Sequence, residues 1–266
     1  VIMESLYGGQ IHPDRDESAN KLIQIINETL ERRGNVYIPC FAVQRTQEVL
    51  NDLKNAKTNK TLASDVPVLL DSPLAQRITQ IYMKTLQMTE ENLFDFENLI
   101  YIRKYKDSVK ISKRAGQAIL AGSGMADGGR IVDHLITGLD NSKNSVIFVG
   151  FQAEGTLGRE LVVGAKKVKI GDKKINVKAQ IHHLQGFSAH GDTNDYQSWV
   201  DRFRSDKMKK IFLIHYEQER SEALKKQFEE KKLPWPAKYI YLRSFKYDSQ
   251  LEVWVKYDQA EKFKLF

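Results

Sequence analysis

The sequence has one cysteine, no long apolar run and no targeting pattern. Cys40 alone cannot form an internal disulfide, and its setting (IPCF) is typical of a thiol packed in a core. Such low cysteine content fits a reducing compartment. No apolar stretch approaches the roughly 20 residues that a membrane-spanning helix needs, and no signal-peptide pattern opens the chain. These absences predict a cytoplasmic protein without disulfides and without a membrane partner.

The excess of positive over negative charge is also small. The 266 residues include 41 Lys and Arg against 34 Asp and Glu, a net charge of +7. This balance favours polyanionic partners slightly, but many enzymes with neutral substrates are as basic. A hydrophobic content of 41% is ordinary for a globular protein, and the length suits one large domain or two modest ones.

Strand and helix patterns alternate along most of the chain. Buried-strand runs such as NVYIPCFA, VPVLL, AILA and SVIFVG are each followed by a helical pattern. This alternation predicts an α/β fold with a doubly wound, mainly parallel sheet. One helix is predicted over residues 16–34, with Ser18 as its N-cap and Gly34 as its C-terminal stop.

From Lys166 the pattern changes to polar and apolar residues alternating around a Gly-Asp turn, which predicts a β-hairpin. The segment carries six lysines: Lys166, Lys167, Lys169, Lys173, Lys174 and Lys178. They either protect a solvated sheet edge or contact phosphate groups. Edge protection is the better interpretation, because lysine is the usual residue for it.

Polar or glycine-rich groups stand at four junctions between predicted elements: Asp71-Ser72, Ser123-Gly124, Gly155-Thr156 and Ser188–His190. In open α/β sheets the carboxyl ends of the strands line the ligand crevice, and glycine turns can bind anions there. The glycines also suit a purely structural role in tight turns. The segment GSGMADGGR does not match the spacing of a dinucleotide-binding loop.

Two histidines stand out, twenty-five positions apart. His190 precedes a helical pattern, and His215 ends the apolar run IFLI. Each suits either a site or a hydrogen-bonded core position, and spacing alone names no metal because the compact clusters of zinc sites are missing. The remaining histidines, His12, His134, His182 and His183, are interpreted as structural.

A succession of motifs resembles a known family. ESLYG, IPCFAVQRTQEVL, DSPLAQRIT, AGSGMADGGR, GFQAEGTLGREL, GFSAHGD and FLIHYE occur in one order between Glu4 and Glu217. This succession resembles the β-CASP branch of the metallo-β-lactamase fold, a branch of RNA-processing nucleases. The resemblance implies a zinc-dependent ribonuclease that hydrolyses RNA phosphodiester bonds.

The resemblance also implies residue roles. Glu4 and His190 match the family's acid/base couple, which protonates the leaving oxygen, and His215 matches a zinc ligand. A carboxylate beside a histidine fixes the tautomer of the ring and favours its charged form. The implied substrate contacts are Ser188, Ser123, Gly124 and Arg45, with a supporting role for Tyr7.

Two departures from the family pattern matter. Tyr216 stands where relatives usually have glycine. The H-x-H-x-D-H zinc box, a further histidine and a bridging aspartate should precede Glu4, and none is present. One histidine cannot hold the two zinc ions that the family uses. Because the chain opens in mid-strand, we expect a fragment of a longer protein, inactive by itself.

The expected architecture has three parts. Residues 1–8 end an N-terminal metallo-β-lactamase half, residues 9–185 form the β-CASP domain, and residues 186–266 belong to the C-terminal part of the metallo-β-lactamase αββα domain. Exposed sheet and apolar surface would make this chain either pair with a second copy or retain the missing half as its partner.

Two other functions stay open at this point. The chain could be a non-catalytic RNA-binding subunit of the same family, although Glu4, His190 and His215 are retained. Its parent could instead hydrolyse DNA or another phosphodiester, which fold resemblance cannot exclude.

Overall fold

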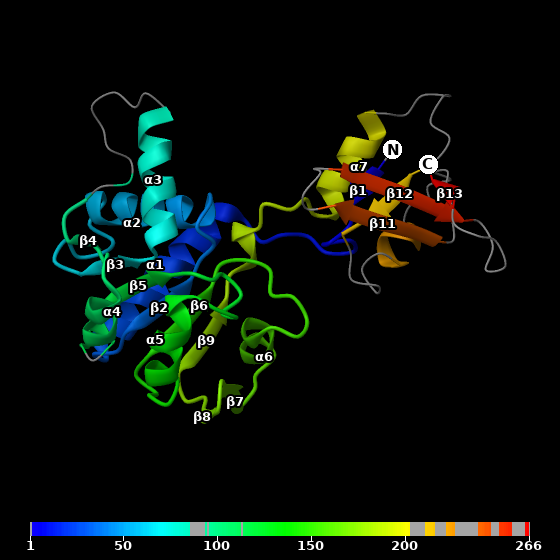
Figure 1. Ribbon diagram of the computed structural model, residues 1–266. Coiled ribbons are helices and arrows are strands. Elements are labelled where there is room, and N and C mark those ends of the chain that lie inside the picture. Colours follow the sequence, from blue (N-terminus) through cyan, green and yellow to red (C-terminus); the bar gives the residue numbers. More distant parts are fainter. Residues whose placement is uncertain are drawn as a thin grey trace. The chain divides into compact units, whose positions relative to one another are not determined.

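The computed structural model describes residues 2–85, 94, 96–112, 114–202, 211–215, 222–226, 239–245, 250–256 and 264–265 (Figure 1). The chain divides into two compact units. One comprises Pro13–Ser188, and the other combines Val1–His12 with Ala189–Phe266. The predicted domain boundaries at residues 8/9 and 185/186 stay a prediction. Among the described residues, no helix has both the length and the apolar character that crossing a membrane requires.

The larger unit is built on a six-stranded sheet in the order β4-β3-β5-β2-β6-β9, and every pair of neighbours is parallel. The strands are β2 (Val36–Pro39), β3 (Val68–Asp71), β4 (Leu99–Tyr101), β5 (Ala118–Ala121), β6 (Ser145–Phe148) and β9 (Gln180–His183). Every residue of β2, β3, β5 and β6 is buried, as expected for parallel strands covered on both faces. The predicted α/β fold with a mainly parallel sheet is confirmed.

Helices cover both faces of this sheet. They are α1 (Arg15–Glu31), α2 (Arg45–Thr58), α3 (Pro73–Thr85), α4 (Tyr105–Ile111), α5 (Arg130–Gly138) and α6 (Leu157–Val162). Successive strand residues enter opposite cores: Ile38 packs with residues of α1, α2 and α3, and Tyr37 packs with residues of α4, α5 and α6. The alternation of side chains along each strand thus produces two separate hydrophobic cores.

The ends of α1 differ from the prediction. The helix is capped by Asp14, whose side chain accepts hydrogen bonds from the backbone N–H groups of Asp16 and Glu17, so the assignment of Ser18 as N-cap was wrong. Gly34 is not the helix stop either, because Arg33 takes the left-handed conformation with φ 59°. Gly34 is required for space, since a Cβ there would lie 1.8 Å from the carbonyl oxygen of Lys143.

Two local features complete the larger unit. The predicted hairpin is confirmed, with β7 (Lys167–Ile170) antiparallel to β8 (Lys173–Asn176) and Gly171 at φ 58° in its turn. Near the end of the unit, a Cβ at Gly186 would lie 2.9 Å from the carbonyl oxygens of both Pro13 and Asp14. The last residues of this unit therefore lie against its first.

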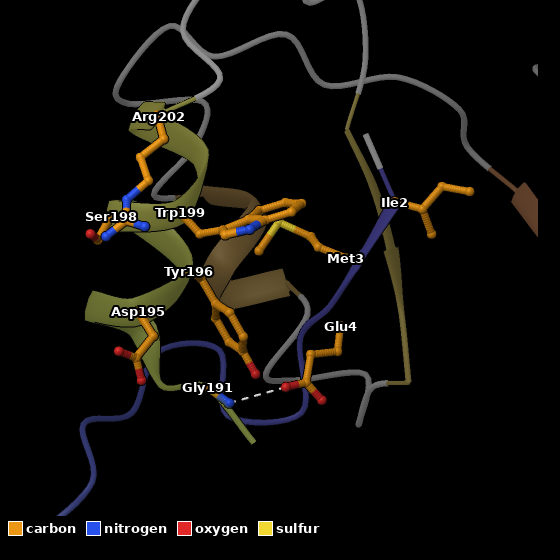
Figure 2. A pocket seen from close by; sticks show the side chains of 9 residues that line it. All are labelled: Ile2, Met3, Glu4, Gly191, Asp195, Tyr196, Ser198, Trp199 and Arg202. Carbon is orange, nitrogen blue, oxygen red and sulfur yellow. Dashed lines mark hydrogen bonds between the residues drawn. The ribbon is translucent and has the colours of Figure 1, made fainter. Parts of the chain in front are cut away.

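The smaller unit pairs the first strand of the chain with a late one. β1 (Ile2–Glu4) lies parallel to β10 (Phe212–Ile214), and α7 (Thr193–Arg202) packs beside them. Met3 points toward α7, where it joins a buried cluster with Tyr196 and Val200 (Figure 2). Residues 222–226 are helical. β11 (Tyr239–Phe245), β12 (Gln250–Lys256) and β13 (Lys264–Leu265) form an antiparallel sheet.

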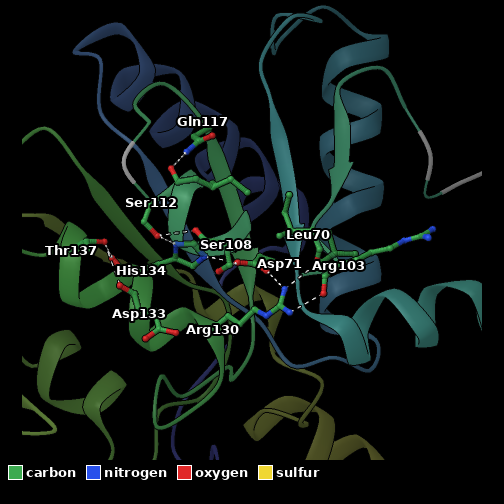
Figure 3. Close-up of polar contacts among 12 residues, drawn as sticks. Leu70, Asp71, Arg103, Ser108, Ser112, Gln117, Arg130, Asp133, His134 and Thr137 are labelled. Atoms are coloured by element: carbon green, nitrogen blue, oxygen red, sulfur yellow. Dashed lines mark hydrogen bonds and ion pairs between the residues drawn. The ribbon is translucent and has the colours of Figure 1, made fainter. Parts of the chain in front are cut away.

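A buried polar network joins β3, α4 and α5 in the larger unit (Figure 3). The carboxylate of Asp71 lies 2.5 Å from Arg130 Nη1 and 2.7 Å from His134 Nε2, and it accepts a hydrogen bond from the Ser108 hydroxyl. His134 Nδ1 lies 2.8 Å from Ser112 Oγ. Asp71 and His134 are fully buried, so Asp71 serves the fold rather than a ligand, and the structural interpretation of His134 is confirmed.

Burial opposes the charge on Asp71, but hydrogen bonds from His134, Ser108 and Arg130 outweigh it and hold the pKa of the carboxyl below its usual value. A carboxylate whose pKa is lower in the folded state stabilises the fold above its unfolded pKa of about 3.9. That stabilisation is lost as the pH falls through the lower folded-state pKa.

Replacing Asp71 by asparagine should therefore lower the free energy of unfolding by about 3 kcal/mol at pH 7, because the Arg130 charge loses its buried partner. The difference from the parent protein should narrow as the pH falls below about 4. Urea unfolding from pH 7 to pH 3 measures both effects. Asp140→Asn is the matched control: its exposed carboxylate pairs with Lys178 at 2.9 Å and should contribute less than about 1 kcal/mol. Equal losses in the two variants would contradict the assignment.

Candidate metal and acid–base site

The register of β1 against β10 brings two site residues from opposite ends of the chain together. Glu4 is the residue opposite Ile214, and the next backbone N–H, that of Ser5, donates to the Ile214 carbonyl at 3.0 Å. His215 follows immediately after β10, so both side chains emerge at the carboxyl ends of neighbouring parallel strands. His215 has φ 48°, a left-handed conformation uncommon for a residue other than glycine.

His190 is presented by the loop that leads into α7. Asp192 holds this loop: one carboxylate oxygen accepts from the N–H groups of Asn194 at 2.8 Å and Asp195 at 3.0 Å, and the other from the His12 N–H at 3.0 Å. Burial opposes the charge on Asp192, but these backbone hydrogen bonds prevail and lower the pKa of its carboxyl. The loop is thus tied both to the helix start and to the segment that follows β1.

Glu4 contacts both histidines. Its Oε2 is hydrogen-bonded to His190 Nδ1 and lies 3.5 Å from His215 Nδ1. Figure 2 shows the contact of its other oxygen, Oε1, which accepts a hydrogen bond from the Gly191 N–H at 3.0 Å. The two imidazole rings have their centroids 4.9 Å apart. One ligand atom from each of the three residues lies within 4.8 Å of the other two. The structure therefore brings together all three residues that sequence reasoning assigned to chemistry.

This cluster has the composition of a catalytic zinc site, because two imidazoles and one carboxylate can hold a zinc ion and leave a fourth position open. It also has the composition of an acid–base pair, because a carboxylate at Nδ1 orients the histidine ring and fixes its tautomer. The Glu4 and His190 side chains are about one third exposed and His215 is more than half exposed, so solvent and substrate can reach them. Tyr216 and Glu217 lie outside the described residues.

His12 was interpreted as structural, and the structure places it against the loop that carries His190. Its Nε2 lies 3.0 Å from the carbonyl oxygen of His190, and its ring centroid lies 4.3 Å from that of the buried Tyr7. Tyr7 is within 6.4 Å of the His190 ring, measured between centroids. The signal that could have identified His12 is its place in the short segment directly after Glu4.

A cavity of about 460 Å³ opens between β1 and α7, with Glu4 among its lining residues (Figure 2). Its other walls include the side chains of Trp199, Asp195 and Arg202. Trp199 is 39% exposed, a high value for a tryptophan. Glu4 thus borders a hollow with aromatic and charged walls.

The predicted substrate contacts belong to the larger unit. Ser188 follows a short 3-10 helix (Gln185–Phe187) and donates its N–H to the Gln185 carbonyl at 2.9 Å. Arg45 begins α2 but is only 8% exposed, and its guanidinium forms an ion pair with Glu48 and lies 5.9 Å from the Phe187 ring centroid. Its charge is therefore partly neutralised inside the fold.

Ser123 and Gly124 lie in the loop after β5. A Cβ at Gly124 would lie 2.7 Å from the ring of Phe41, which is 44% exposed, so the glycine makes room for that aromatic side chain. The carbonyl of Gly124 accepts from Gln152 Nε2 at 3.1 Å. Ser123 Oγ is buried and, within the described part of the chain, has no hydrogen-bond partner.

Two family models match this chain. The Beta-Casp domain matches residues 46–161, within the larger unit. The Zn-dependent metallo-hydrolase RNA specificity domain matches residues 174–239, which include the His190 loop and β10.

Curated relatives agree with these matches. A ribonuclease of Thermus thermophilus is 32% identical over 237 residues, covering 85% of this chain and 53% of its own length. An RNase J-like protein of Methanocaldococcus jannaschii is 35% identical, covering 83% of this chain and 52% of its own length. Transcription termination factor FttA of Thermococcus kodakarensis is 34% identical, and the match covers 82% of this chain and 36% of the length of that protein.

The chain spans about half the length of the first two relatives. Its parallel sheet, its Glu4–His190–His215 cluster and the two matched models agree with the resemblance drawn from the motifs. The chain belongs to the β-CASP family of the metallo-β-lactamase fold.

Proposed function

We propose that the intact protein is a zinc-dependent ribonuclease that hydrolyses RNA phosphodiester bonds, with Glu4 and His190 as its acid–base couple. The observation that carries this proposal is the hydrogen bond between Glu4 and His190 Nδ1 beside His215. The match to a metallo-hydrolase RNA specificity domain over residues 174–239 supports RNA as the substrate.

The proposed role of each residue follows from its contacts. Glu4 accepts a hydrogen bond from His190 Nδ1. A proton is therefore held on Nδ1, and the opposite ring nitrogen, Nε2, takes part in proton transfer. In the proposed reaction His190, oriented by Glu4, donates a proton from Nε2 to the leaving oxygen. The Gly191 N–H fixes the second carboxylate oxygen at 3.0 Å and keeps the couple aligned.

His215 is proposed as a zinc ligand beside the Glu4–His190 couple. A zinc ion held at His215 would supply an activated water and would neutralise charge on the scissile phosphate. A site for two zinc ions needs more ligands than one histidine, and we propose that a metallo-β-lactamase segment outside this chain supplies them. The share of the relatives that the chain spans supports this proposal. A second copy of the chain is the alternative source, and light scattering distinguishes a dimer from a monomer.

The function in transcription is the second candidate, since the relatives include proteins named as transcription termination factors. A non-catalytic RNA-binding role and activity on DNA are the remaining alternatives. Comparing the cleavage of RNA, DNA and small phosphodiesters in zinc-replete buffer shows whether the protein is catalytic and which of these substrates it hydrolyses. A cytoplasmic location remains a proposal based on the single cysteine.

Replacing His190 by alanine in the intact protein should lower the cleavage rate by about 10²–10⁴-fold, because the general acid is removed. RNA binding should change little, since the imidazole acts on the leaving group. Cleavage assays and fluorescence anisotropy measure the two effects. His182→Ala in β9 is the matched control and should retain activity. Unchanged turnover in the His190 variant would refute the assignment.

Removal of the metal provides a separate prediction. Dialysis against a chelator should abolish cleavage, and zinc should restore it, because the proposed reaction needs an activated water. His215→Ala should retain less zinc than the parent protein when both are assayed by elemental mass spectrometry, because one ligand is lost. Equal zinc contents would show that His215 is not a ligand.

A further inference from the structure

The outward face of the β7–β8 hairpin carries three lysines at adjacent positions. Lys169 lies directly opposite Lys174 in the strand register, and Lys167 lies opposite Asn176. All three lysines are exposed. Cβ atoms of directly opposed residues are about 4.5–5.5 Å apart, and the diagonal positions Lys167 and Lys174 are also within reach of long side chains. We call Lys167, Lys169 and Lys174 the lysine face.

The opposite face of the hairpin is packed into the unit. Val168, Ile170 and Ile175 are buried and belong to the core that contains α5 and α6. The segment after β8 is held by backbone hydrogen bonds, with the N–H of Lys178 donating to the Leu139 carbonyl at 2.8 Å. The lysine face is therefore a fixed surface rather than a mobile tail.

Protection of a sheet edge does not explain this arrangement. Lysines that guard an edge can be spaced apart, whereas like charges directly opposite each other destabilise a hairpin. Among the described residues, no ion pair involves the lysine face, while the nearby Lys178 pairs with Asp140. The turn contributes one acidic residue, Asp172, against the six lysines of this segment. The repulsion between Lys169 and Lys174 would be relieved by a bound polyanion.

We propose that the lysine face binds backbone phosphates of the RNA strand. This inference rests on the proposed function for its choice of polyanion, and it adds a contact in the Pro13–Ser188 unit, separate from the Glu4–His190–His215 cluster. Ammonium groups bind phosphates as point charges without reading the bases. The contact therefore strengthens RNA binding and positions the RNA strand on the protein, independent of the RNA sequence.

The test compares Lys169→Ala/Lys174→Ala with the parent protein. Each phosphate contact contributes about 0.7 to the slope of log affinity against log salt for a single strand. The double variant should lower this slope by about 1.4 and weaken binding about tenfold near 150 mM salt. Lys106→Ala/Lys110→Ala is the matched control, because these exposed lysines lie one turn apart on α4 and their removal changes the net charge equally. Fluorescence anisotropy with an RNA of about 30 nucleotides measures both.

A second variant separates binding from folding. Lys174→Glu places opposite charges across the strand pair with Lys169, so it should keep or raise the melting temperature of the protein. It should nevertheless weaken RNA binding more than Lys174→Ala does, because a carboxylate repels phosphate. A loss of affinity in a variant at least as stable as its parent cannot be attributed to unfolding.

The outcomes distinguish this inference from the proposed function. If the intact protein cleaves RNA and the two double variants have the same salt slope as the parent, the lysine face does not bind RNA and this inference fails alone. If RNA binding depends on the lysine face but no cleavage occurs under any metal condition, the nuclease assignment fails and this inference stands. Absence of any RNA binding overturns both.

Discussion

The parallel pairing of β1 with β10 is the constraint on which the candidate site depends. Its register sets Glu4 opposite Ile214 and so brings the carboxylate beside His215, across 211 positions of sequence. A shift by one residue would turn Glu4 to the other face of the sheet and Met3 out of its buried cluster. The apolar packing of Met3 against α7 therefore also fixes the position of Glu4 beside His215, and the His190 loop leads directly into α7.

The chain contains two carboxylate–histidine pairs, and burial separates their roles. Asp71 and His134 are fully buried, and the carboxylate is also bound by Arg130 and Ser108, so the pair is enclosed by the protein. Glu4 and His190 are about one third exposed, and the His190 loop is held by the Asp192 carboxylate and by the hydrogen bond from the Gly191 N–H to Glu4. Proton transfer to a substrate requires access, which is available to the second pair and denied to the first.

Short apolar runs were enough to predict the parallel sheet and the hairpin, and ordered motifs were enough to group Glu4, His190 and His215, because both signals can be read without knowledge of packing. Sequence patterns failed where two nearby residues suited the same structural role equally well. Asp14 and Ser18 are both capable N-caps before the same apolar pattern, and only backbone geometry selects Asp14. Likewise, Gly34 and Gly124 looked like turn or ligand glycines, but their Cβ positions are filled by Lys143 and Phe41, which are distant in sequence. The contact of His12 with the His190 loop also depends on tertiary structure alone.

The two ends of the larger unit lie together, because Gly186 packs closely against the carbonyl groups of Pro13 and Asp14. The chain therefore enters and leaves the larger unit at neighbouring positions. An insertion of this kind separates the flanking segments of the smaller unit by no more than a short loop would. The closeness of Gly186 to Pro13 thus offers a physical reason why one unit can hold another in mid-chain and still assemble Glu4 with His190.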